Sequence, residues 1–466
     1  MNYLSTRGQA PAVQFETALL SGLAPDGGLY LPADWPRMRE DVSGMSFSTA
    51  AARILEPFVT SWIGRGALEE MTASAFSSFD HGDVAPLVQI DDQDYVLELF
   101  HGPTLAFKDV AMQLLAVFFD HALAGSDRRA TIVGATSGDT GGAAIEAFRG
   151  CDHAEVFILF PEGRVSDVQR LMMTTVADRN IHAVAVSGTF DDCQRIVKAL
   201  FADRTLAERV GLTGVNSINW ARLAVQTVYY FTALAELKRR TGESAASFSI
   251  PTGNFGDAFA GYAAKRMGAE ITRFCIAVNR NDILHRAMTS GRYEPAGVEP
   301  TTSPSMDIQI ASNFERLLFE ASGRDGEAVR ALMDNFEENG AYDIPRAWLA
   351  RIREDFISER ISEGDVMQSI AEAFSAMDML IDPHTAVGLA AVRKARASGR
   401  LSGPVITLAT AHPAKFPDAV EKAAGRRPQL PERLRALFSL PEHFETAPPD
   451  IEAVREIILA RTPAEA

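Results

Sequence analysis

The first residue whose position suggests chemistry is Lys108, in the segment from His101 to Asp109 (His-Gly-Pro-Thr-Leu-Ala-Phe-Lys-Asp). An apolar run, Tyr95 to Phe100, precedes this segment and a longer apolar stretch follows it. The pattern predicts a strand, a Gly-Pro turn and a helix that begins near Lys108. A lysine amine becomes a nucleophile toward an aldehyde when its surroundings lower its pKa. The alternative is a solvated lysine near a helix start.

A loop rich in glycine and hydroxyl groups, Gly134 to Gly142, follows a predicted strand over Thr131–Ala135 and precedes a predicted helix over Ala143–Phe148. Glycines allow backbone N–H groups to point inward, and a helix N-terminus attracts anions. The alternative is a tight turn in which Ser and Thr cap the helix. The candidate ligands of a substrate carboxylate in this loop are Thr136, Ser137, Gly138, Asp139 and Thr140.

A second loop of this kind lies between a predicted strand over Phe248–Thr252 and a predicted helix over Ala258–Met267. It lacks both the Gly-Lys-Ser/Thr of nucleotide hydrolases and the dinucleotide fingerprint, so a single phosphate fits it better than a nucleotide. Its last residue, Asp257, would repel a phosphate, and we expect its side chain to cap the helix or turn away. The candidate phosphate ligands are Gly253, Asn254, Phe255, Gly256 and Asp257.

A lysine after one strand and two anion-binding loops after others predict an aldehyde cofactor that carries a phosphate, which is pyridoxal 5'-phosphate. Lys108 would hold its aldehyde, the 253–257 loop its phosphate, and the 136–140 loop the carboxylate of an amino acid substrate. No metal ligand set accompanies these residues. The cysteines Cys151, Cys193 and Cys275 are few, odd in number and widely separated, without a Cys-x-x-Cys pair, a pattern that predicts neither a zinc site nor a disulfide framework.

The elements that position these residues alternate between strands and helices, which predicts an α/β fold with parallel sheets covered by helices. Further strands are expected over Glu155–Phe160, His182–Ser187, Phe274–Val278 and Val405–Ala409. The apolar stretch Ala224–Leu237 is too short and polar to span a membrane and is interpreted as a buried helix. A terminal helix is predicted over Ile451–Leu459.

Composition and charge limit the partners of the chain. Its 466 residues include 45 Lys and Arg against 61 Asp and Glu, a net charge of -16, without a long basic run. This balance argues against nucleic acid or an anionic membrane as a partner. Residues Met1 to Pro11 do not have the order of a signal peptide, so we expect a cytoplasmic protein.

The motifs resemble those of the threonine synthase family, within the fold type II pyridoxal-phosphate enzymes. Besides the lysine segment and both loops, the similar segments are Tyr3–Gly8, Gly22–Tyr30, Asn219–Arg222, Ser303–Ile308, Ser312–Arg316, Asp382–Ala386 and Thr410–Phe416. The resemblance implies an N-terminal domain over residues 1–86, a catalytic region over 87–427 with two α/β subdomains around the active site, and a helical tail over 428–466. It also implies a monomer or a homodimer.

The resemblance further implies the roles of single residues. Lys108 would form a Schiff base with the cofactor, the 253–257 loop would bind its phosphate, and Thr410 would meet its pyridine nitrogen. The implied reaction converts O-phospho-L-homoserine and water to L-threonine and phosphate, by γ-elimination and β-addition of water. Arg222 and Lys415 either meet the substrate phosphate or form surface ion pairs, and His384 either caps or packs against its helix or takes part in catalysis.

Three alternative functions remain open at this point. A related phospho-lyase would release 2-oxobutyrate from the same substrate, and a catalytically silent relative would only bind ligand. A nicotinamide oxidoreductase is suggested by the α/β rhythm alone, and its fingerprint is absent.

Overall fold

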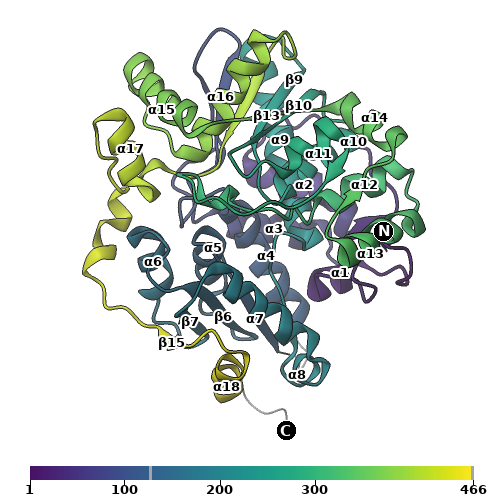
Figure 1. Cartoon of the computed structure of the whole chain (residues 1–466), viewed down its shortest axis with the longest axis vertical. Helices are drawn as coiled ribbons and strands as arrows, with labels where there is room; N and C mark the ends of the chain where they lie inside the picture. The colour runs from purple at the N-terminus through teal and green to yellow at the C-terminus, as the bar shows by residue number, and fades with distance from the viewer. Residues whose placement is uncertain (125–128, 463–466) are drawn as a thin grey trace.

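Two β-sheets, each covered by helices on both faces, dominate the computed structural model, which describes residues 1–124 and 129–462 (Figure 1). In the six-stranded sheet all neighbouring strands are parallel except the pair β3 and β4. Its order is β13 (Phe356–Arg360), β10 (Ile271–Val278), β9 (Ala246–Pro251), β14 (Val405–Ala409), β4 (Asp94–Glu98) and β3 (Leu87–Gln89). The five-stranded sheet is entirely parallel, in the order β15 (Glu445–Ala447), β7 (Ile181–Val186), β6 (Ala154–Pro161), β5 (Ala130–Ala135) and β8 (Leu212–Thr213).

Apolar side chains alternate between the two faces of each sheet, as parallel strands buried on both faces require. In β14, Ile406 and Leu408 belong to one apolar cluster, while Val405 and Ala409 belong to the other. The first cluster includes α9 (Trp220–Thr241) and α10 (Gly256–Met267), and the second includes α15 (Glu363–Met377) and α16 (Pro383–Ala397). One face of the five-stranded sheet packs against α4 (Lys108–Leu123) and α5 (Asp139–Phe148). Its other face packs against α7 (Phe190–Ala202), α8 (Arg204–Val210) and α18 (Ile451–Arg461).

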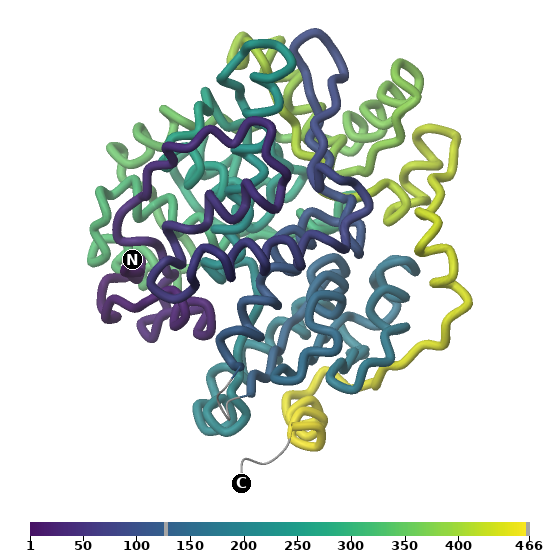
Figure 2. Tube along the Cα trace, turned by 180° about the vertical axis from the view of Figure 1, so that it is seen from behind, coloured from purple at the N-terminus to yellow at the C-terminus, as the bar shows by residue number. Residues whose placement is uncertain are grey.

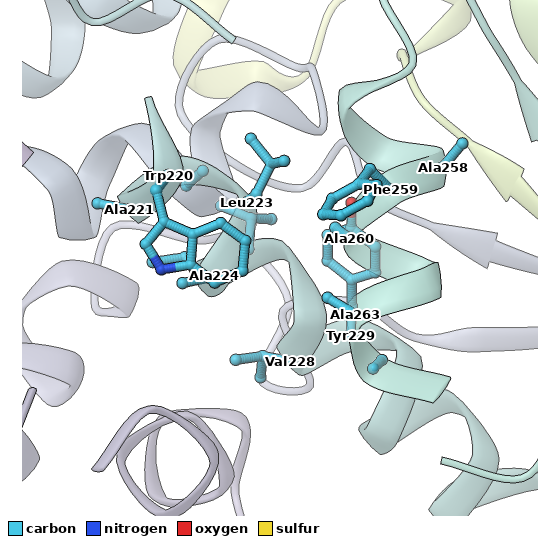
Figure 3. Close-up of a cluster of buried hydrophobic side chains, with 14 of the residues drawn as sticks. Trp220, Ala221, Leu223, Ala224, Val228, Tyr229, Ala258, Phe259, Ala260 and Ala263 are labelled. Atoms are coloured by element: carbon cyan, nitrogen blue, oxygen red, sulfur yellow. The ribbon is translucent and has the colours of Figure 1, made fainter. Parts of the chain in front are cut away.

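Helices α9 and α10 pack along each other in the centre of the first cluster. Figure 3 shows the side chains of α9, among them Trp220 and Tyr229, beside those of α10, among them Phe259 and Ala263. Trp220, Tyr229 and Phe259 are fully buried, and small residues such as Ala263 let the two backbones approach. This packing fixes the polar residues of α9 relative to the start of α10.

The first 86 residues pack against the outside of this helix layer (Figure 2). They form the antiparallel pair β1 (Tyr3–Ser5) and β2 (Tyr30–Pro32), with α1 (Phe15–Ser21), α2 (Phe47–Val59) and α3 (Arg65–Phe76). The ring of Phe58 lies 5.7 Å from that of Trp220, so the core of this segment is continuous with α9. The division of the chain into domains at residues 86 and 427 remains a prediction.

The remaining elements connect the two sheets or extend them. They are α6 (Asp167–Thr174), α11 (Ile283–Ser290), β11 (Arg292–Tyr293), α12 (Phe314–Ser322), α13 (Gly326–Asn339), β12 (Tyr342–Asp343), α14 (Arg346–Asp355), α17 (Pro417–Ala424) and the 3-10 helices η1 (Pro304–Met306), η2 (Pro413–Lys415) and η3 (Glu432–Ser439). After α17 the chain runs along the outside of the molecule to β15 and α18, on the other sheet (Figure 2). Among the described residues, no helix is long and apolar enough to cross a membrane.

Every predicted strand is present, with ends that differ by at most three residues from the prediction. The helix predicted over Ala143–Phe148 begins earlier, at Asp139, so part of the glycine-rich loop is the first turn of α5. The structure also has β13, an edge strand that follows α14 directly and was not among the strands predicted from the sequence.

Candidate active site

Three of the predicted site segments are neighbours because of the strand order. Strand β14 lies between β9 and β4, so the residues beyond their carboxyl ends meet at one edge of the six-stranded sheet. These residues are Lys108 beyond β4, Thr410 beyond β14 and the loop Gly253–Asp257 beyond β9. The backbone N–H of Phe107 donates to the carbonyl of Thr410 at 2.9 Å, which ties the lysine segment to the end of β14.

The turn before Lys108 is shaped by the buried carboxylate of Asp109. This carboxylate accepts hydrogen bonds from the backbone N–H of Thr104 at 2.8 Å and from its hydroxyl at 2.5 Å. A Cβ at Gly102 would lie 2.5 Å from that of Asp109, so the turn requires glycine there. The side chain of Lys108 is consequently held inside the protein, with 13% of its surface exposed. Burial lowers the pKa of Lys108, and the carboxylate of Asp139 opposes this effect only in part.

Asp139 lies at the first turn of α5 and joins the ends of the two sheets. Its Oδ2 lies 3.5 Å from Nζ of Lys108 and accepts from the hydroxyl of Ser305 at 3.0 Å. Its Oδ1 lies 2.6 Å from Nζ of Lys415 and accepts from Nε2 of Gln169 at 3.0 Å. Burial alone would raise the pKa of Asp139, but the positive charges of Lys415 and Lys108 hold it well below its usual range. Asp139 is therefore an ionised carboxylate with no free acceptor facing a substrate.

The other residues of this loop divide into supporting and open groups. The hydroxyl of Thr136 accepts from the backbone N–H groups of Gly138 and Gly141, at 2.9 Å each, and so shapes the turn. Gly138 has a φ of 134°, and a Cβ there would lie 2.4 Å from the side chain of Gln169. The hydroxyls of Ser137 and Thr140 have no hydrogen-bond partner among the described residues, so they remain available to a ligand.

Ser305, in η1, links Asp139 to the start of α16. Its backbone N–H donates to Nε2 of His384 at 3.2 Å, and Nδ1 of His384 lies 2.6 Å from Oδ2 of Asp382. These two contacts assign the ring proton to Nδ1. Asp382 also caps α16 by accepting from the backbone of Thr385 at 3.0 Å. His384 therefore belongs to the cap of its helix and also supports the 303–307 segment.

The loop after β9 offers several backbone donors to a ligand. No backbone N–H from Gly253 to Asp257 donates a hydrogen bond to another described residue. Phe255 has a φ of 63°, and α10 begins at the next residue, so these donors lie at a helix N-terminus. The amide oxygen of Asn254 accepts from the backbone of Ser312 at 2.5 Å, and its Nδ2 donates to the hydroxyl of Ser217. The loop is thus held by its neighbours while its own donors stay open.

Asp257 turns its carboxylate away from the loop and toward α9, in agreement with the expectation. Its Oδ1 accepts from the hydroxyls of Tyr229 at 2.5 Å and Tyr230 at 2.8 Å. Its Oδ2 is buried without a partner among the described residues. Burial raises the pKa of Asp257 to about 6, with only partial compensation from the two tyrosine hydrogen bonds.

The open groups fit the predicted cofactor. Pyridoxal phosphate presents an aldehyde, a ring nitrogen and a phosphate, and the site offers a buried amine, a hydroxyl and a set of free N–H donors. The hydroxyl is that of Thr410, a residue that is 7% exposed, and this hydroxyl has no hydrogen-bond partner among the described residues. The donors, the hydroxyl and the amine lie beyond the ends of three consecutive strands of one sheet, β9, β14 and β4. The roles of these single residues remain predictions.

Arg222 and Lys415 are both buried, at 2% and 1% exposure, so the surface ion pair considered for them is wrong. Lys415 donates to the carbonyl of Thr104 at 2.9 Å and pairs with Asp139, which uses its amine inside the protein. Arg222 donates to the carbonyl of Val215 at 3.0 Å, but its Nε has no partner among the residues that the structure describes. Burial lowers the pKa of Arg222 to about 10. The positive charge of Arg222 lowers the pKa of Lys108. Arg222 therefore remains the candidate ligand of the substrate phosphate, as distinct from the phosphate of the cofactor.

Sequence reasoning missed part of the shell around Asp139. Gln169 is the third residue of α6 and belongs to a capping box with Ser166, a pattern that predicts only a helix start. Lys415 stands in a segment that drew attention because of Thr410, five residues earlier. Ser305 was named only as part of the similar segment Ser303–Ile308. None of these signals indicated a shared partner.

Comparison with known protein families agrees with the geometry of the site. Residues 86–335, more than half of the chain, match the family model for pyridoxal-phosphate dependent enzymes. The fold and the site thus define an enzyme of the pyridoxal-phosphate class, as predicted.

The narrower family follows from the two ends of the chain and from whole-length relatives. Residues 2–76 match the model for the threonine synthase N terminus, and residues 385–458 match that for the threonine synthase C-terminal region. Threonine synthase from Pseudomonas aeruginosa is 48% identical over 98% of both chains. The crystal structure of PLP-bound threonine synthase from Brucella melitensis superposes with a TM-score of 0.95 at 51% identity over 100% of both chains, and that of the yeast enzyme with 0.93 at 38% identity over 99% of this chain and 98% of that one. The chain belongs to the threonine synthase family.

Proposed function

We propose that this protein is a threonine synthase that converts O-phospho-L-homoserine and water to L-threonine and phosphate. The observation that carries the proposal is the buried amine of Lys108, which lies 3.5 Å from Asp139 and beyond the same edge of the six-stranded sheet as the open donors of the 253–257 loop. The matches to threonine synthases over the whole chain support the choice of this reaction among those of the class.

Apart from Lys108, whose Nζ lies 3.5 Å from Oδ2 of Asp139, the groups that would hold the cofactor have no other hydrogen-bond partner among the described residues. Lys108 Nζ would bind its aldehyde, the N–H groups of Gly253–Asp257 its phosphate, and the hydroxyl of Thr410 its ring nitrogen. When bound, pyridoxal phosphate supplies an aldehyde for the substrate amine and a ring that withdraws electrons from the substrate α-carbon. A neutral hydroxyl beside the ring nitrogen does not enforce its protonation, which favours elimination over transamination.

Lys108 would also serve as the mobile base of the reaction. Once the substrate has displaced its amine, Nζ could take a proton from the α-carbon, because burial has lowered the pKa of Lys108, and could take a proton from the β-carbon after passing the first one on. Phosphate would leave the γ-carbon, which receives a proton in exchange, water would supply the hydroxyl of the β-carbon, and the α-carbon would be reprotonated before the amine returns. The side chain stays within reach of the site because α4 and the Asp109 turn fix its Cα.

The two anionic ends of the substrate would meet different parts of the site. The free hydroxyls of Ser137 and Thr140, with the backbone of the 136–140 loop, would bind the substrate carboxylate. Arg222 would bind the substrate phosphate, since its Nε is buried without a partner and its charge has no carboxylate within ion-pair distance among the described residues. An incoming phosphate would supply that missing partner.

The experiment that tests this function separates it from both rivals. Purified protein is incubated with pyridoxal phosphate and O-phospho-L-homoserine, and phosphate, threonine and 2-oxobutyrate are quantified. Equal amounts of phosphate and threonine are expected. Phosphate with 2-oxobutyrate would instead indicate the phospho-lyase, and no phosphate would indicate a silent relative.

The variant Lys108→Ala is expected to lose turnover, since it removes both the cofactor attachment and the base. Lys265→Ala is the matched control, because it removes a lysine that pairs with Asp355 at 2.6 Å on the outer side of α10. The control should keep wild-type turnover. Substantial threonine formation by Lys108→Ala would refute the assignment.

We further propose that the enzyme acts in the cytoplasm as a monomer or homodimer, without nucleic acid or membrane partners. The acidic net charge of -16 and the lack of a basic run support this expectation. Light scattering of the purified protein measures its oligomeric state, and a larger assembly would contradict the proposal.

A further inference from the structure

Lys415 is the most completely buried lysine that the structure describes, and both of its contacts lie next to Lys108. Its Nζ pairs with Oδ1 of Asp139 at 2.6 Å and donates to the carbonyl of Thr104 at 2.9 Å. Lys415 belongs to η2, just beyond β14, whereas Asp139 begins α5 on the other sheet. The ion pair between Lys415 and Asp139 therefore connects the ends of the two sheets. Asp139, one partner of this pair, also contacts Lys108.

The charges around Lys108 come from four elements. On its own helix α4, Asp109 turns its carboxylate to Thr104, away from the amine. From α5, Asp139 approaches Nζ of Lys108 to 3.5 Å and favours its protonated form. From η2 and α9, Lys415 and Arg222 disfavour it. His384 of α16 reaches Asp139 through Ser305, whose backbone N–H donates to Nε2 of His384 and whose hydroxyl donates to the carboxylate of Asp139. Asp139 is thus the carboxylate that could hold a proton on Lys108.

We propose that Lys415 is a positioning residue that acts on Lys108 through Asp139, by holding this carboxylate in an ion pair so that it does not retain the proton of the Lys108 amine. The distances show that Asp139 pairs more closely with Lys415 than with Lys108, since its carboxylate lies 2.6 Å from Nζ of Lys415 but 3.5 Å from Nζ of Lys108. The proton lost by Lys108 passes to solvent or substrate, and Lys415 keeps its own. The inference rests on the proposed role of Lys108 as the amine that holds the cofactor.

The proposal predicts opposite effects for the two partners of the ion pair. Lys415→Met leaves Asp139 unneutralised beside Lys108 and should raise the pKa of Lys108 by at least about one pH unit, a tenfold loss of the neutral amine. Asp139→Asn leaves the charge of Lys415 unpaired and should lower that pKa. The double variant removes one charge of each sign and should return the pKa close to the wild-type value.

The test follows the neutral amine of Lys108 directly. The cofactor-free full-length chain is mixed with pyridoxal phosphate at a series of pH values, reduced with borohydride, and analysed for the modified Lys108 peptide. Since only the neutral amine captures the aldehyde, the rate against pH reports the pKa of Lys108. The acidic limb of kcat against pH is measured on the loaded enzyme as a second readout.

Two controls separate electrostatics from structure. Lys415→Arg keeps the positive charge and should retain the wild-type pH profile. Lys265→Met removes another ion pair of 2.6 Å, with Asp355, and should leave the pH profile of Lys108 unchanged. The proposal is overturned if Lys415→Met keeps the wild-type profile, or if the double variant stays shifted. If Lys415→Met does not fold, a profile of Asp139→Asn that fails to move to lower pH overturns it equally. Absence of label on wild-type Lys108 would instead refute the proposed function.

Discussion

Replacing Arg222 with methionine is expected to stabilise the cofactor-free chain and at the same time to weaken substrate binding. Arg222 is buried at 2% exposure, and within residues 1–124 and 129–462 its guanidinium has one hydrogen bond, to the carbonyl of Val215, while Nε is left without a partner. A buried charge in this position is costly to the free protein. It is useful only when an anion occupies the space beside it.

The cost follows from the pKa of Arg222, which burial lowers from its ordinary 12.5 to about 10. The folded chain thus disfavours the charged form, and at neutral pH, where the group is charged both folded and unfolded, the penalty is roughly 3 kcal/mol. Methionine keeps most of the apolar stem of Arg222 but loses the hydrogen bond to Val215. This loss reduces the gain in stability by about 1 kcal/mol. The free energy of unfolding should therefore rise by roughly 2 kcal/mol.

The effect on binding has the opposite sign. A charge-assisted hydrogen bond from Arg222 to the substrate phosphate is worth about 1.5–3 kcal/mol, which corresponds to roughly 10- to 150-fold in affinity. We expect KM for O-phospho-L-homoserine and the inhibition constant of inorganic phosphate to rise together by such a factor. The dissociation constant of the cofactor should change much less, because its phosphate is assigned to the 253–257 loop.

The assay compares wild type, Arg222→Met and Arg222→Lys by thermal unfolding without cofactor and by steady-state kinetics with it. Arg222→Lys is the matched control, since it keeps a buried charge and should not share the gain in stability. If Arg222→Met unfolds at a lower temperature than wild type and KM is unchanged, the arginine is a structural residue and the reasoning is refuted.

Two further variants test the loop after β9. Asp257 has a pKa near 6 instead of 3.8, so ionisation destabilises the folded chain as the pH rises through this range. Asp257→Asn should therefore gain about 1 to 2 kcal/mol relative to wild type between pH 5 and pH 8, and a difference in unfolding temperature that does not vary with pH would contradict this. A Cβ at Gly253 would lie 2.9 Å from the carbonyl of Ser305, so Gly253→Ala should weaken cofactor binding by roughly 5- to 150-fold in an absorbance titration. Gly64→Ala, where a Cβ meets nothing within 4 Å, should leave cofactor binding unchanged, and equal affinity in both variants would show that the contact at Gly253 is unimportant.

Much of the fold was predictable because its signals are local. Parallel strands buried on both faces require continuous apolar runs, and the runs at Thr131, Glu155, Phe274 and Val405 coincide with β5, β6, β10 and β14. Strand β13 was missed because its sequence, Phe-Ile-Ser-Glu-Arg, has only two apolar residues and directly follows a helix. As an edge strand it pairs with β10 on one side only, so its sequence is under weaker constraint.

The strand-to-loop-to-helix segments that carry Lys108, Thr136–Thr140 and Gly253–Asp257 could be predicted, because turn residues and apolar periodicity act over a few neighbouring positions. Only the folded structure shows that Lys415 pairs with Asp139, that Asp257 faces two tyrosines, and that Arg222 is buried without a counter-ion among the described residues. These properties depend on the order of strands in the sheets and on the packing of helices over them. Burial and distance set the charge state of a side chain, and neither is encoded in the residues adjacent to it in sequence.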